Sequence, residues 1–115
     1  MNPSSILVWN ARGLNQRDQR ISVRDTILSS RSDVVCIQET KADFMSQTLF
    51  LSVFGTDYDK FAALPAVNTR GGIVIAWKSS VCDVIASRID NLSVFVQFIG
   101  MEGRNWWFTR VYATG

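Results

Sequence analysis

The first half of the chain alternates short apolar runs with longer segments in which apolar positions recur at helical spacing. Residues 5–9 (SILVW) form an apolar run of strand length, which is followed by a turn at Gly13. Residues 17–30 place Ile21, Ile27 and Leu28 among arginines, and this pattern predicts an amphipathic helix. Residues 33–40 (DVVCIQET) are rich in β-branched side chains and become polar at the end. They predict a buried strand whose C-terminal tip reaches the surface.

A second helix is predicted over residues 44–54 (FMSQTLFLSVF), with Asp43 as its N-cap and Gly55 as its stop. The pattern then changes to strand-like runs at residues 58–64, 72–77, 81–89, 92–99 and 105–113. The last three are joined by residues 90–91 and 101–104, which suit tight hairpins. The sequence therefore predicts one α/β domain over residues 1–115, with a mixed sheet, two helices on one face and then an antiparallel meander.

The composition is that of a folded domain, with 47% hydrophobic and 19% charged residues among 115. Cys36 and Cys82 both lie in apolar runs, and we expect reduced, unpaired thiols of an intracellular protein, cytoplasmic or nuclear. The early stretch without acidic residues leaves mitochondrial targeting as an alternative. No apolar run approaches the roughly 18 residues of a membrane span, so we expect no membrane partner.

The net charge of +2 does not indicate a partner, but arginines concentrate in one region. Arg12, Arg17, Arg20 and Arg24 lie in or just before the first predicted helix. Such a run usually forms a solvated helix face. The alternative is a surface that contacts the phosphates of a nucleic acid.

Polar residues that suit chemistry lie where two predicted strands end. Asn10 follows the first apolar run, and Glu39 lies at the tip of the second strand. One carboxylate and one amide would suit a Mg²⁺ ion that keeps most of its waters and takes other ligands from a substrate phosphate. The residues alone favour the simpler interpretation, with Glu39 a surface acid, Asn10 a turn residue and Tyr112 a strand aromatic.

Four segments occur together in a distinctive order: WNARGLN at 9–15, CIQETK at 36–41, RGGIVIAW at 70–77 and VY at 111–112. This set closely resembles the endonuclease/exonuclease/phosphatase superfamily of DNase I-like enzymes. It is most similar to the N-terminal half of the endonuclease domain of plant LINE-type retrotransposons. The resemblance implies that Glu39 is a metal ligand, that Asn10 helps to order metal and phosphate, and that Tyr112 lies against the scissile phosphate.

The resemblance also implies what is missing. The family reaction needs a histidine, a mid-domain Asp-x-Asn pair and a late Asp-His pair, and this chain contains no histidine. Loss of one member of a catalytic unit costs several orders of magnitude in rate. We therefore expect no enzyme activity, no working cofactor and at most a vestigial, weak Mg²⁺ site at Glu39.

The implied fold is the N-terminal half of a DNase I-like layered sandwich in which each half supplies one sheet. Ile73, Ile75, Phe95 and Trp107 would then form an apolar face with no cover, and the last strand an open edge. We expect a second copy or another protein to cover them. The sequence thus favours a non-catalytic interaction protein; half of a nuclease and a nucleic-acid-binding module are the alternatives.

Overall fold

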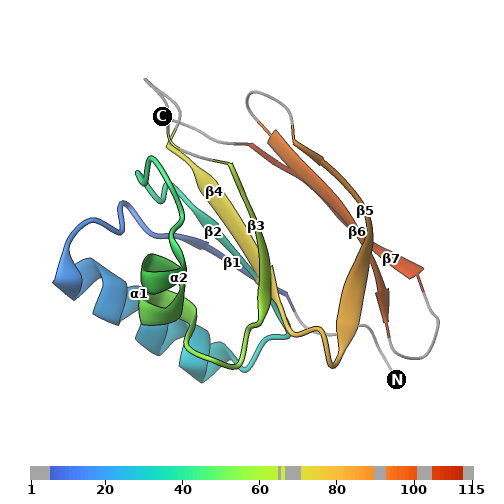
Figure 1. Ribbon diagram of the computed structural model, residues 1–115, viewed down its shortest axis with the longest axis horizontal. Helices are drawn as coiled ribbons and strands as arrows, with labels where there is room; N and C mark the ends of the chain where they lie inside the picture. The colour runs from blue at the N-terminus through green and yellow to red at the C-terminus, as the bar shows by residue number, and fades with distance from the viewer. Residues whose placement is uncertain (1–5, 65, 67–70, 90–92, 101–104, 113–115) are drawn as a thin grey trace.

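The computed structural model describes residues 6–64, 66, 71–89, 93–100 and 105–112, with side chains described through residue 83 and again at 97–99. These residues form three layers, with the helices on one side of a first sheet and a second sheet on its other side (Figure 1). The elements in chain order are β1 (Ile6–Asn10), α1 (Arg17–Ser30), β2 (Val34–Gln38), α2 (Gln47–Phe54), β3 (Lys60–Leu64), β4 (Ile73–Trp77), β5 (Cys82–Ile89), β6 (Ser93–Gly100) and β7 (Asn105–Tyr112).

The first sheet has the strand order β1-β2-β4-β3, and the second has the order β5-β6-β7. Strands β1 and β2 are parallel, while β4 runs antiparallel to both β2 and β3. The second sheet is an antiparallel meander. The predicted fold class, a mixed sheet with two helices followed by a meander, is therefore confirmed.

The two helices begin and end for local reasons. Helix α1 buries Val23 and Ile27 against the sheet and ends where Arg31 takes a left-handed conformation, with φ 52°. Asp43 does not cap α2, contrary to the sequence prediction. The helix begins three residues later than predicted because the Ser46 side chain accepts a hydrogen bond of 3.1 Å from the Leu49 N–H.

Two hydrophobic clusters lie on opposite faces of the first sheet, as the two-residue alternation of strands requires. Val35 and Ile37 face the helices, whereas Cys36 faces the second sheet. Ile73 and Ile75 are fully buried on that side and share a cluster with Phe98 of β6. The prediction that Ile73 and Ile75 form an uncovered face is therefore wrong, because the meander leaves the first sheet and packs over it. The side chains of Phe95 and Trp107 lie outside the described residues.

Both cysteines are free, as predicted. Burial raises the pKa of the Cys36 thiol to about 12 and is the main cause that raises the pKa of Cys82 to about 11. In the part of the chain that the structure describes, no helix is long and apolar enough to cross a membrane.

Replacement of Ile75 by alanine tests whether this chain covers its own inner face. Ile75 is 0% exposed between the two sheets, so we expect Ile75→Ala to lower the free energy of unfolding by about 2–5 kcal/mol. The control is Ile21→Ala on α1, where the side chain is 45% exposed and the loss should stay within about 1 kcal/mol. Urea unfolding followed by circular dichroism measures both. Equal, small losses would show that the second sheet does not cover Ile75.

Candidate functional site

The topology brings Asn10 and Glu39 together at one end of the first sheet. Parallel pairing of β1 with β2 sets Asn10 opposite Gln38, so Glu39 follows immediately past the strand end. The Asn10 amide nitrogen donates a hydrogen bond to Oε2 of Glu39. Its oxygen accepts one of 2.9 Å from the Arg12 N–H. The two partners fix the orientation of the Asn10 amide, which holds the carboxylate in place.

The backbone at this end of the sheet is strained. Arg12, Glu39 and Lys41 have φ values of 55°, 53° and 53°, in the left-handed region that non-glycine residues seldom occupy. Each such residue costs on the order of 1–2 kcal/mol. Backbone strain of this kind gathers at functional sites, where the surrounding structure over-determines it.

Main-chain hydrogen bonds continue the β1–β2 pairing beyond both strands and hold the strained residues. The Ala11 N–H donates to the Gln38 carbonyl at 2.9 Å, and the Gly13 N–H donates to the Glu39 carbonyl at 2.7 Å. The Leu14 N–H donates to the Thr40 carbonyl at 2.9 Å. The segments after β1 and β2 therefore form one ledge, residues 10–14 and 38–41.

Gly71 and Gly72, from the third motif, support the ledge from the β4 side. The Thr40 N–H donates to the Gly72 carbonyl at 3.3 Å, and the Lys41 N–H donates to the Gly71 carbonyl at 2.6 Å. Gly72 has φ 88°, and a Cβ there would lie 2.4 Å from Oγ1 of Thr40. Only glycine fits this position. The sequence did not show this role, although the Gly-Gly pair before a strand was its signal.

The site offers a metal ion fewer free side-chain ligands than the sequence suggested. The Asn10 oxygen already accepts a hydrogen bond from the Arg12 N–H, and Glu39 supplies the only carboxylate of the pair. Among the described residues, no three His, Cys, Asp or Glu side chains gather as a metal cage. A hydrated Mg²⁺, which needs as few as one or two carboxylates, fits this donor set, and a structural Zn²⁺ site does not. Arg12 and Lys41 are both exposed on the ledge, where a phosphate could meet them.

The structure describes the other predicted site residues to different extents. Tyr112 ends β7, opposite Ser93 of β6, and its side chain lies outside the described residues. Arg17 and Arg24 are exposed on α1. Arg20 instead donates a hydrogen bond of 2.9 Å from Nη1 to the Leu14 carbonyl, so it also supports the ledge.

The sequence profile of the Endonuclease/Exonuclease/phosphatase family matches residues 7–112. The chain belongs to this family. No curated protein matches it at a significant level.

Solved structures of low sequence identity share the family fold. The human nocturnin catalytic domain, solved with bound sulfate, has a TM-score of 0.70 at 16% identity, over 91% of this chain and 48% of its own. AP endonuclease from Leishmania major gives 0.60 at 17% identity, over 96% and 39%. TDP2 of D. rerio, complexed with a single-strand DNA product, gives 0.64 at 18% identity, over 91% and 43%. The chain spans less than half the length of each.

Two replacements of Glu39 separate the carboxylate from the backbone strain. Because glycine tolerates φ 53° and alanine does not, we expect Glu39→Gly to be about 1 kcal/mol more stable than Glu39→Ala. The same comparison at Asp25, which is exposed in the middle of helix α1, should be reversed, with glycine about 1 kcal/mol less stable than alanine. Urea unfolding of the four variants measures both differences. A glycine variant of Glu39 less stable than its alanine variant would contradict the strained ledge.

Proposed function

We propose that this chain carries the metal-facing and phosphate-facing half of a phosphodiesterase site, is not catalytic alone, and acts by associating with another polypeptide. The observation that supports this most is the Asn10–Glu39 pair, held on a strained and fully hydrogen-bonded ledge. A domain that served only as a packing surface would gain nothing from keeping an oriented carboxylate at a costly backbone conformation. The WNARGLN, IQETK and RGGI motifs support an origin in a plant LINE-type retroelement.

We expect the chain alone to be inactive because its candidate general bases do not lie near Glu39. It contains no histidine, the most common general base. Asp59 bonds to Ser79, Asp33 pairs with Lys78, and Asp83 pairs with Lys60. By the register of β2, β3 and β4, these three acids lie at the opposite end of the first sheet from Glu39. A hydrated Mg²⁺ on Glu39 would polarise a phosphate but would find no base among them.

Strand β1 is the surface best suited to the association. It is an edge strand of the first sheet, and its neighbouring residues Val8 and Trp9 are 48% and 43% exposed on opposite faces. Parallel strands are normally covered on both faces. A strand from another polypeptide that paired with β1 would cover both side chains and would end beside Asn10. The β1 edge replaces the Ile73–Ile75 face as the proposed association surface, because this chain covers that face with its own second sheet. The partner at the β1 edge is a second copy of the chain or a different protein that completes the fold.

The nucleic-acid interpretation has a narrower basis. Arg12, Arg17 and Arg24 are exposed, and a nucleic acid bound at the completed site could contact them through its phosphates. These phosphate contacts depend on the phosphodiesterase site, so we do not propose nucleic-acid binding as the main function of the chain alone.

Titration with Mg²⁺, followed through the Asn10 side-chain amide by NMR, tests the metal half of the proposal. One carboxylate holds a hydrated ion poorly, so we expect a Kd of about 1 mM or weaker that disappears in Glu39→Gln. Asp57→Asn, which removes an exposed acid beyond α2, should leave the titration unchanged. Plasmid and abasic DNA should remain intact at saturating Mg²⁺. A micromolar site, or nicking that is lost in Glu39→Ala, would overturn the claim that the chain alone is inactive.

A further inference from the structure

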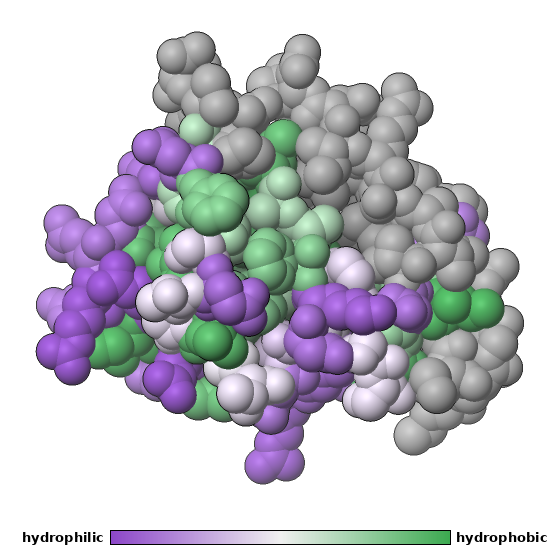
Figure 2. Space-filling model, in the orientation of Figure 1, coloured by the Kyte–Doolittle hydropathy of each residue, from purple (hydrophilic) through white to green (hydrophobic). Residues whose placement is uncertain are grey.

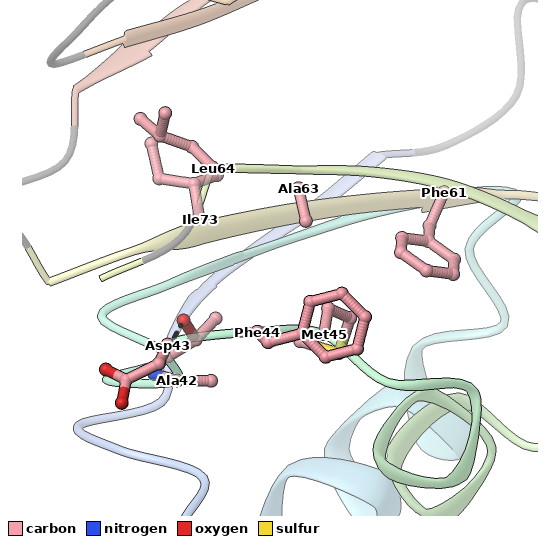
Figure 3. Close-up of a pocket in the computed structure, with 9 residues that line it drawn as sticks. Ala42, Asp43, Phe44, Met45, Phe61, Ala63, Leu64 and Ile73 are labelled. Atoms are coloured by element: carbon pink, nitrogen blue, oxygen red, sulfur yellow. Dashed lines mark hydrogen bonds between the residues drawn. The ribbon is translucent and has the colours of Figure 1, made fainter. Parts of the chain in front are cut away.

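A mostly apolar pocket lies beside the ledge, between the loop that follows Glu39 and the edge strand β3. Its volume is about 360 Å³, enough for one bulky side chain. Figure 3 shows Phe44 and Met45 on the loop facing Phe61 and Ala63 of β3, with Leu64 and Ile73 toward one end. In Figure 2, hydrophobic side chains gather in the middle of this face, with polar groups to their left and below them.

Phe44 is the exceptional residue of this pocket. Its side chain is 75% exposed, the largest exposure among the large apolar residues that the structure describes. Two hydrogen bonds hold the main chain two residues before Phe44: the Ala66 N–H donates one of 2.9 Å to the Ala42 carbonyl, and the Ala42 N–H donates one of 3.4 Å to Oγ1 of Thr40. An exposed aromatic ring on a fixed loop can take part in binding at little cost in conformational entropy.

Strand β3 presents an open main-chain edge along the same pocket. It is the outer strand of the first sheet, and among the strands that the structure describes β4 is its only partner. Alternate N–H and C=O groups of an edge strand point outward and can pair with an added strand. The pocket lies at the C-terminal end of β3, so a strand added to this edge could place a side chain into it.

We propose that the β3 edge and the Phe44 pocket together bind an extended peptide segment of a partner protein by strand addition, with one bulky apolar side chain in the pocket. Asp43 is the only charged residue among the lining residues that the structure describes, so a basic residue beside the apolar one completes the match. This site does not depend on the proposed phosphodiesterase function. It lies on the edge of the sheet opposite β1.

A peptide fits the lining better than a nucleobase does. Reading the edge of a base would need accessible hydrogen-bonding groups, but Thr40, the only hydroxyl among the described lining residues, is 2% exposed. Among the described lining residues, Asp43 carries the only charge, and its carboxylate suits a basic side chain better than a phosphate. The carbon-rich remainder suits a Leu, Met or Phe side chain.

Selection of a random heptapeptide display library on the full chain, followed by titration of the enriched peptides as synthetic probes, tests the proposal. We expect the enriched sequences to share one bulky apolar residue next to a basic one. Phe44→Ala should weaken their binding at least about tenfold, as the loss of one buried aromatic contact does. Phe44 is exposed, so this variant should fold normally, as circular dichroism will check. Leu28→Ala, which truncates a side chain 56% exposed on α1, is the matched control and should change the affinity less than about twofold.

Methylation of alternate main-chain nitrogens of the peptide tests strand addition separately. Methylation of the nitrogens that point toward β3 should weaken binding at least about tenfold. Methylation of the alternate nitrogens, which point away from β3, should have little effect. Failure to enrich any peptide, equal binding by Phe44→Ala, or equal binding of both methylated forms would overturn the proposal. So would displacement of the peptide by oligothymidylate, which would assign the pocket to single-stranded nucleic acid.

Discussion

Main-chain hydrogen bonds past the ends of β1, β2 and β4 are the constraint on which the candidate site depends. Five of them join the two segments of the ledge, residues 10–14 and 38–41, to each other and to Gly71 and Gly72. Without these bonds nothing would keep Glu39 and Lys41 at positive φ, and the Asn10 amide would have no fixed carboxylate to hold. The chemistry of the site thus rests on backbone geometry that three separate segments enforce together.

The same sheet gives its two edges different properties. At β1 the edge strand leaves apolar side chains exposed on both faces, beside the carboxylate that a second polypeptide would have to complete. At β3 the edge borders a pocket with an exposed aromatic ring and lies away from the strand that needs completion. The two edges thus carry separate proposals, a partner polypeptide at β1 and a peptide segment at β3.

Local pattern was sufficient to predict most elements and the meeting of Asn10 with Glu39. Helix α1 and the strands from β1 to β7 lie where apolar periodicity placed them, and the parallel β1–α1–β2 unit brings its strand tips together whatever the rest of the chain does. The prediction that Asp43 caps α2 was wrong because Ser46, nearer the apolar run, makes the capping hydrogen bond. That error concerns a choice among several possible capping residues, which the sequence alone leaves open.

The larger errors concerned contacts between residues far apart in the sequence. No pattern in residues 73–75 shows that the meander folds back over them, because burial by a distant strand leaves no trace in local periodicity. The need for glycine at position 72 likewise depends on Thr40, a residue far away in the sequence.

Hydrogen exchange of the Gly13 and Lys41 amides, measured in the chain alone without a metal, tests the central claim most directly. These two N–H groups make the shortest main-chain hydrogen bonds of the ledge, 2.7 and 2.6 Å. A ledge formed before any ligand binds predicts strong protection of both amides, close to that of the β2 strand interior, and little change when Mg²⁺ is added. Exchange at the rate of an unstructured loop without metal, with protection appearing only when Mg²⁺ is present, would contradict the account.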